Sequence, residues 1–177
     1  MTLRSICLHG PESTGKSTMA PRLAQHFDTT CIAEFGRTYC EAYGTDLTMA
    51  DLLMIAHAHD AKTRAAVETR DHPVFLDTDP LMTAVWADML FGRRDPWFDQ
   101  WQGTADLYLL FDIDLPWVDD GTRMFGSSER RQRFFDLSRR ELDRRGVRYA
   151  VVGGEGQQRF MNALKAIEQA RSEVRDT

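Results

Sequence analysis

The sequence predicts an α/β protein in which helices cover both faces of a five-stranded parallel sheet. Two observations lead to this fold class. Five short apolar runs of strand type alternate with segments of helical periodicity, and no repeat, low-complexity tract or linker interrupts them. The chain has 177 residues, of which 42% are hydrophobic and 28% charged, as in an ordinary globular domain. We therefore expect residues 1–177 to form one domain, with its active site at the carboxyl ends of the strands.

The first strand and the first helix flank a phosphate-binding loop. Residues 10–17, GPESTGKS, fit the pattern G-x-x-x-x-G-K-[ST] at every fixed position, between an apolar run at 6–8 and helical spacing over 17–27. Such a loop points backbone N–H groups at one anion, and the helix dipole adds positive potential there. Lys16 would reach the β- and γ-phosphates, and the Ser17 hydroxyl would bind Mg²⁺. We predict that ATP binds through Gly10, Glu12, Ser13, Thr14, Gly15, Lys16, Ser17 and Thr18.

A second strand over residues 29–33 leads into Glu34-Phe35-Gly36-Arg37, which places a carboxylate and a guanidinium just past a strand end. Thr48 and Asp51 then form a weak capping box for a long helix that extends toward residue 70. His57 and His59 lie on this helix. Because residues two apart point to different faces, we expect partly exposed histidines rather than one metal site.

The third strand, residues 73–76, ends at Asp77-Thr78-Asp79. A carboxylate at the end of an apolar strand, in a protein with a phosphate loop, is the expected ligand of Mg²⁺ or the expected base, so we assign Asp77 to that role. Asp79 precedes Pro80 and fits the cap of the next helix, a role that does not exclude a place in the site.

The second half of the chain predicts an amphipathic helix over 81–91, a fourth strand over 106–113, a helix that ends at Gly146 and a fifth strand over 149–152. Trp86 is expected in the core or against an aromatic ring of a substrate. Between the fourth strand and the Arg-rich helix, a polar, Gly-containing segment carries Arg123. Residues 115–133 have the composition of a lid, and Arg123 would stabilise charge on the transferring phosphate.

Composition limits the classes of partner. The net charge of −5 does not favour nucleic acid. Three cysteines without metal-ligand spacing indicate reduced thiols, and no apolar run is long enough to cross a bilayer. The chain enters its first strand with no room for a charged-then-apolar signal segment. We therefore expect a cytoplasmic protein that acts on a small molecule. The sequence leaves its oligomeric state open.

Four segments together resemble a known family: the phosphate loop, Ala33-Glu34-Phe35-Gly36-Arg37, Leu76-Asp77-Thr78-Asp79 and a segment from Trp117 to Arg123 followed by Gly126-Ser127. In order and spacing they are similar to the nicotinamide riboside kinase domain of the NadR-type NAD-salvage regulators. The resemblance implies a P-loop fold of the nucleoside and nucleotide kinases, and ATP-dependent phosphorylation of a ribosyl 5′-hydroxyl. Nicotinamide riboside would become nicotinamide mononucleotide.

The resemblance also implies roles for single residues. Lys16, Asp77 and Arg123 would be catalytic, and Ser17 and Asp77 would hold the metal. Glu34, Phe35, Arg37, Asp79 and Trp86 would bind the substrate. Relatives have Trp where this chain has Ala33, which leaves Phe35, Tyr39 or Trp86 to stack on the base. Two alternatives stay open: a kinase for another nucleoside, and a P-loop ATPase that acts as a regulatory switch.

Overall fold

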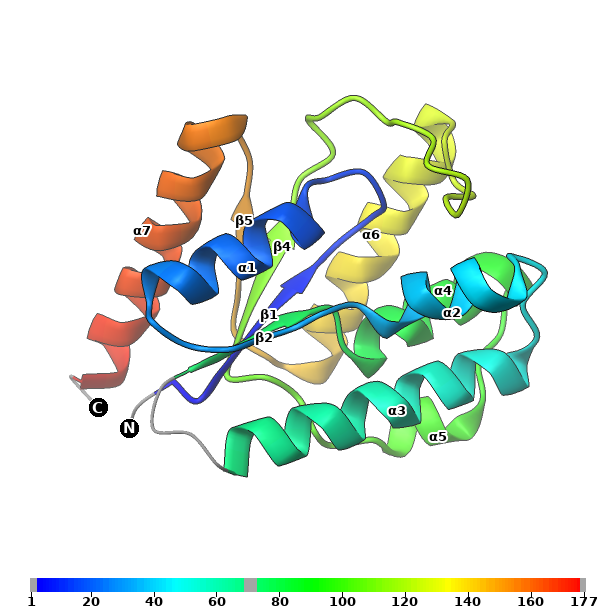
Figure 1. Cartoon of the computed structure of the whole chain (residues 1–177), viewed down its shortest axis with the longest axis horizontal. Helices are drawn as coiled ribbons and strands as arrows, with labels where there is room; N and C mark the ends of the chain where they lie inside the picture. The colour runs from blue at the N-terminus through cyan, green and yellow to red at the C-terminus, as the bar shows by residue number, and fades with distance from the viewer. Residues whose placement is uncertain (1–2, 69–72, 176–177) are drawn as a thin grey trace.

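Five parallel strands form the centre of the protein, and helices lie on both sides of them (Figure 1). The computed structural model describes residues 3–68 and 73–175. The strand order is β2-β3-β1-β4-β5. The strands are β1 (Ser5–His9), β2 (Cys31–Ile32), β3 (Val74–Asp77), β4 (Leu107–Phe111) and β5 (Tyr149–Val152). The helices are α1 (Lys16–His26), α2 (Phe35–Tyr43), α3 (Met49–Glu68), α4 (Pro80–Phe91), α5 (Pro96–Gln100), α6 (Ser128–Arg145) and α7 (Gly156–Arg175).

The three central strands are buried on both faces, which is why they are mostly apolar rather than alternating. On one face, Ile6 and Leu8 of β1 pack with side chains of α1 and α7, such as Leu23 and Ile167. On the other face, Cys7 belongs to a cluster that includes side chains of α4 and α6. The predicted doubly wound α/β sheet is confirmed. None of the described helices has the length and apolarity of a membrane span.

The sheet brings the phosphate loop and Asp77 to the same edge. Leu8 of β1 is in register with Asp77 of β3 and with Leu109 of β4. Gly10 follows β1 with φ +127°, and a Cβ there would lie 2.8 Å from the carbonyl oxygen of Phe111. Only glycine tolerates both this backbone conformation and this close approach. The chain can therefore turn into the loop directly at the carboxyl edge of the sheet.

The capping box at the start of α3 is confirmed. The Thr48 hydroxyl accepts from the Asp51 N–H at 3.3 Å, and the Asp51 carboxylate accepts from the Thr48 N–H at 2.7 Å. Asp51 also accepts from the Tyr39 hydroxyl of α2 at 2.5 Å. The cap therefore joins two helices. The last predicted residues of this helix, 69 and 70, lie outside the described residues.

The segment around Glu34 differs from the sequence prediction. The strand predicted over 29–33 is only the two residues Cys31–Ile32, at the edge of the sheet. Glu34 to Arg37 lie just past the end of this strand, as predicted, but they also form the start of a helix, α2, that was not predicted. This helix is hard to predict from residue propensities, because its first turn contains a glycine and no side chain caps its start.

Helix α4 is not amphipathic, contrary to the prediction. All residues from Pro80 to Ala87 are buried except Trp86, which is half-buried. Helix α4 is buried nearly all round because it packs against both α3 and α6, which leaves no solvent-facing side along its first two turns. The predicted N-cap and the proline at the first helical position are both present.

Candidate active site

The phosphate loop wraps around the amino end of α1. The Thr14 hydroxyl donates to the Pro11 carbonyl at 2.9 Å, and the Lys16 ammonium donates to the same carbonyl at 2.6 Å. Lys16 is buried, and burial lowers its pKa, whereas the nearby carboxylates of Glu34 and Asp77 act in the opposite direction. Lys16 therefore lies where a bound phosphate would replace lost hydration with a direct charge pair.

The lid predicted from the sequence lies against the phosphate loop. The Glu12 carboxylate accepts from the main-chain N–H groups of Met124 and Phe125, both at 2.9 Å. The Ser13 hydroxyl accepts from the Val118 N–H at 2.9 Å and from the Arg123 guanidinium at 3.0 Å. The loop that approaches the site runs from 112 to 127, while residues 128–133 belong to the first turns of α6.

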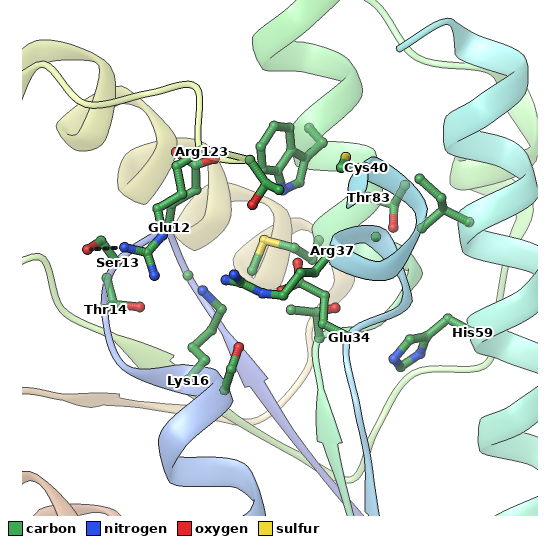
Figure 2. Close-up of a pocket in the computed structure, with 18 of the residues that line it drawn as sticks. Glu12, Ser13, Thr14, Lys16, Glu34, Arg37, Cys40, His59, Thr83 and Arg123 are labelled. Carbon is green, nitrogen blue, oxygen red and sulfur yellow. Dashed lines mark hydrogen bonds between the residues drawn. The ribbon is translucent and has the colours of Figure 1, made fainter. Parts of the chain in front are cut away.

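Two guanidinium groups meet at the mouth of the cavity. Arg37 of α2 and Arg123 of the lid both pair with Asp120, at 2.6 Å and 3.1 Å. Burial acts to raise the pKa of Asp120, but hydrogen bonds from Arg37 and Thr122 and the charge of Arg37 lower it to about 2. Figure 2 shows the Arg37 and Lys16 side chains pointing into the same space between the phosphate loop and α2. An anionic ligand in this space would compete with Asp120 for both arginines.

Asp77 has the environment that a magnesium ligand needs. It is buried at the end of β3, and its Oδ1 has no hydrogen-bond partner among the described residues. Burial raises its pKa, and the charge of Lys16 and a hydrogen bond from the Ser17 hydroxyl lower it. An unpaired buried carboxylate oxygen beside a serine hydroxyl is an oxygen donor set of the type that Mg²⁺ prefers. Ser17 and Asp77 thus fit the predicted metal pair.

Glu34 occupies the N-cap position of α2 and faces the cavity, although its side chain makes no capping bond. Burial and the charge of Asp77 raise its pKa to about 7, while Lys16 and Arg37 act to lower it. A carboxylate with a pKa near neutrality that is not engaged in capping can accept a proton from a ligand.

Beyond Glu34 the cavity becomes apolar. Its walls there come from α2, α3 and α4 and the loop before α3, and they include Cys40, Leu47, Leu52, Ile55, Met82, Thr83 and Trp86. The Trp86 ring packs against two other aromatic rings, with its centroid 5.0 Å from that of Phe125 and 5.6 Å from that of Phe134. Of the three aromatic residues predicted to stack on a base, Trp86 lines this cavity, whereas Phe35 and Tyr39 do not line it.

Phe35 and Asp79, both predicted to bind substrate, lie away from the cavity lining. Phe35 lies instead beneath the ammonium group of Lys62, 4.6 Å from its ring centroid. Asp79 Oδ1 accepts from the N–H groups of Leu81 and Met82, and Oδ2 accepts from the Tyr108 hydroxyl at 2.5 Å. The Asp79 carboxylate is therefore turned into the protein to cap α4, and Thr78 lines the cavity in its place.

Replacing Asp79 with Ala is expected to lower the free energy of unfolding by about 2–4 kcal/mol. The variant loses a helix cap and leaves the buried Tyr108 hydroxyl without its acceptor. Urea denaturation measures this, with Asp95→Ala as the matched control. Asp95 caps the short helix α5 through the Trp97 N–H, so its loss is expected to cost about 1 kcal/mol. Equal stability losses in the two variants would contradict a special role of Asp79 in folding.

Several cavity residues escaped sequence reasoning. Gly36, Thr78 and Thr122 line the cavity from within recognised motifs but had no role assigned. The other missed lining residues lie in no motif: Cys40, Leu47, Leu52, Ile55, His59, Met82 and Thr83. His59 was expected to be partly exposed, but only 2% of it is exposed. His57 is exposed, so the two histidines do face different directions. A periodic signal existed, because Leu52, Ile55 and His59 follow one face of α3.

The fold also gathers Cys7, His9 and Asp79, which no spacing in the sequence suggests. One potential ligand atom of each lies within 4.8 Å of the others, and all three residues are buried. Burial lowers the pKa of His9 to about 3 and raises that of Asp79 to about 6. Because both Asp79 oxygens are already hydrogen-bonded, we interpret this cluster as a buried polar group beneath the site.

A family model described as AAA domain matches residues 5–159 of the chain. The chain belongs to this family. Among curated proteins, the trifunctional NAD biosynthesis/regulator protein NadR of Escherichia coli (strain K12) is 31% identical over 182 residues. That match includes 98% of this chain and 44% of NadR, so the chain spans less than half the length of that relative. The resemblance to the NadR family is thereby confirmed.

Solved structures agree on the fold. A crystal structure of NadR in complex with NR has a TM-score of 0.79 at 23% identity and covers 96% of this chain and 51% of that one. A crystal structure of NadR in complex with NAD and AMP-PNP has a TM-score of 0.78 at 25% identity, and the match covers 96% of this chain and 50% of that one. The crystal structure of thymidylate kinase from Ehrlichia chaffeensis has a TM-score of 0.68 at 15% identity, and the match covers 96% of this chain and 99% of that one. The chain therefore has the P-loop fold found in nucleoside and nucleotide kinases.

Proposed function

We propose that this protein is an ATP-dependent kinase that phosphorylates the 5′-hydroxyl of a nucleoside, and that nicotinamide riboside is its acceptor. The proposal depends most on one observation: a continuous cavity joins the phosphate loop to an apolar chamber, with Glu34 at the junction. The first part suits a triphosphate and the second a nucleoside base. The NadR relatives and the NadR structure with NR support the choice of acceptor.

The protein's own residues would lower the barrier by positioning and by charge. The phosphate-loop N–H groups and Lys16 would hold the β- and γ-phosphates, and Arg123 would approach the transferring group from the lid. Glu34 would accept the proton of the 5′-hydroxyl as the oxygen attacks phosphorus, and ADP would leave. Ser17 and Asp77 would hold Mg²⁺, which supplies positive charge against the β- and γ-phosphate oxygens.

Trp86 is the proposed stacking residue for the base. Ala33 is exposed and presents no ring, and Phe35 and Tyr39 lie outside the cavity lining. The Trp86 face could interact with a positively charged pyridinium ring through the negative potential of its π-system. The aromatic contact that Ala33 cannot make would thus come from α4.

Asp77→Asn is expected to lower kcat by about 100-fold or more and to raise the Mg²⁺ concentration needed for half-maximal activity, since an amide is a weaker ligand for a hard cation. Steady-state rates over a Mg²⁺ titration measure both effects. Asp112→Asn is the control, because Asp112 follows β4 at the same edge of the sheet, but its Oδ1 already accepts from the Ile113 N–H. Unchanged Mg²⁺ dependence in Asp77→Asn would remove Asp77 from the metal site.

The release of ADP from Mg·ATP, with and without nucleoside, tests the reaction class. The proposed kinase releases ADP only when an acceptor is present, because the phosphoryl group needs the nucleoside hydroxyl. Release at the same rate without any nucleoside would contradict the proposal and indicate a switch ATPase instead.

A further inference from the structure

His59 lies at the wall of the acceptor chamber, yet it has no assigned role. It is on α3, one turn after Ile55, and it lines the cavity although only 2% of it is exposed. Figure 2 shows its ring pointing from α3 toward Glu34. A buried histidine at the wall of a cavity must find its hydrogen-bond partners within the protein or in a ligand.

One side of the ring lacks a partner. Nδ1 lies 3.5 Å from the Thr63 hydroxyl, at the limit of a hydrogen bond. Nε2 is buried, and no described residue meets the distance and angle of a hydrogen bond to it, although the Asp77 main chain is close enough to the ring to raise its pKa. Leaving a buried polar atom unpaired costs about 1–3 kcal/mol, so a ligand atom that meets Nε2 would recover that energy on binding.

The environment keeps the His59 ring neutral at physiological pH. Burial lowers its pKa to about 4, and the charge of Lys62 acts in the same direction. Asp60 and the main-chain carbonyl of Asp77 act in the opposite direction but with smaller effect. A neutral imidazole nitrogen either donates or accepts one hydrogen bond, and it brings no charge to the acceptor chamber.

Several other residues of this chamber have no free polar atom to offer a planar ring. Leu47, Leu52, Ile55 and Met82 are apolar, and the Thr83 hydroxyl already donates to the Asp79 carbonyl at 3.5 Å. We propose that His59 Nε2 hydrogen-bonds an uncharged polar substituent on the base of the acceptor, and so determines which base is accepted. This inference rests on the proposed nucleoside kinase function.

A carboxamide is the substituent that suits this position. It carries both a donor and an acceptor, and by rotating it can satisfy either tautomer of the imidazole. A carboxylate would lie near the carboxyl groups of Glu34 and Asp77, which would repel its charge. An amide that pairs with Nε2 would therefore be preferred to the corresponding acid.

The test compares three acceptors in the wild-type protein, in His59→Phe and in His59→Gln. The acceptors are nicotinamide riboside, nicotinic acid riboside and pyridine riboside, which has no substituent on its ring. Phe keeps a ring but cannot hydrogen-bond, whereas Gln can replace Nε2 with an amide. Thermal unfolding of each variant and the KM for ATP show whether the fold and the phosphate site are intact.

In His59→Phe, kcat/KM for nicotinamide riboside should fall by about 10- to 100-fold, the range for a buried hydrogen bond left unmade. For pyridine riboside the change should stay within about threefold, since no hydrogen bond is lost. His59→Gln should recover most of the loss. The wild-type preference for the amide over the acid should shrink in His59→Phe.

An equal loss for nicotinamide riboside and pyridine riboside would overturn the inference, because it would mean that His59 only supports the fold of the chamber. No loss for either would overturn it as well. If the wild-type protein phosphorylates a different nucleoside, the choice of nicotinamide riboside is wrong. The role of His59 is then judged by the same comparison between that nucleoside and its analogue without the polar group.

Discussion

Replacing Lys16 with Ala should reduce kcat by about 1,000-fold or more while the protein remains folded. The Lys16 ammonium is buried beside the phosphate loop and donates to the Pro11 carbonyl at 2.6 Å, so it is positioned before a phosphate arrives. Charge that develops on transferring phosphoryl oxygens is stabilised strongly by such a pre-positioned cation. Removing the ammonium also removes a buried charge, so we expect little loss of stability.

The matched control is Lys165→Ala. Lys165 lies exposed on α7, outside the cavity that contains the phosphate loop, and its loss changes the net charge by the same amount. Initial rates with Mg·ATP and nicotinamide riboside, together with thermal unfolding, separate the two variants. An active Lys16→Ala protein would overturn the assignment of this loop to ATP.

The second large effect concerns the proton of the acceptor hydroxyl. Glu34→Gln should lower kcat by about 100- to 10,000-fold, the usual contribution of a general base. Gln keeps the size of the side chain and loses its basicity, so the KM for ATP should change little. Glu41→Gln on the exposed side of α2 is the control, because it removes one carboxylate from the same helix outside the cavity.

The pH dependence of kcat/KM tests the same role of Glu34 as the base. Because burial and Asp77 raise the pKa of Glu34 from 4.5 to about 7, the base is increasingly protonated, and inactive, as the pH falls through that range. We therefore expect kcat/KM for the acceptor to rise with pH and to level off above an apparent pKa between 4.5 and about 7. Glu34→Gln should lose this acidic limb along with most of its activity. A limb that persists unchanged in Glu34→Gln would assign the proton transfer to another group, such as Asp77.

The sheet and the nucleotide end of the site could be predicted from sequence because their signals are local. The phosphate loop has fixed residues at fixed spacing, and the buried strands are apolar runs bounded by turns. Asp77 was placed correctly at a strand end because parallel strands all finish at one edge. The capping box of α3 could be predicted for the same reason, since it lies within four consecutive residues.

The acceptor end could be predicted only in part, because tertiary packing decides much of it. Glu34 and Trp86 were expected there and line the cavity, but the start of α2 at Glu34 was missed because no side chain caps it. Asp79, like Asp77, is an aspartate near the end of β3. Its carboxylate is nevertheless turned into the protein, because it accepts hydrogen bonds from Tyr108 on β4 and from an N–H group of α4. His59 became a cavity residue only through burial by neighbours far away in the chain.

The most direct measurement is the rate of phosphoryl transfer from Mg·ATP to nicotinamide riboside, set against a panel of ordinary ribo- and deoxyribonucleosides, with the product identified by mass. We expect a kcat/KM for nicotinamide riboside at least about 100-fold above that for every other nucleoside, and a product with the mass of nicotinamide mononucleotide. A higher kcat/KM for another nucleoside would contradict the proposed acceptor, and phosphate release with no nucleoside product would contradict the kinase itself.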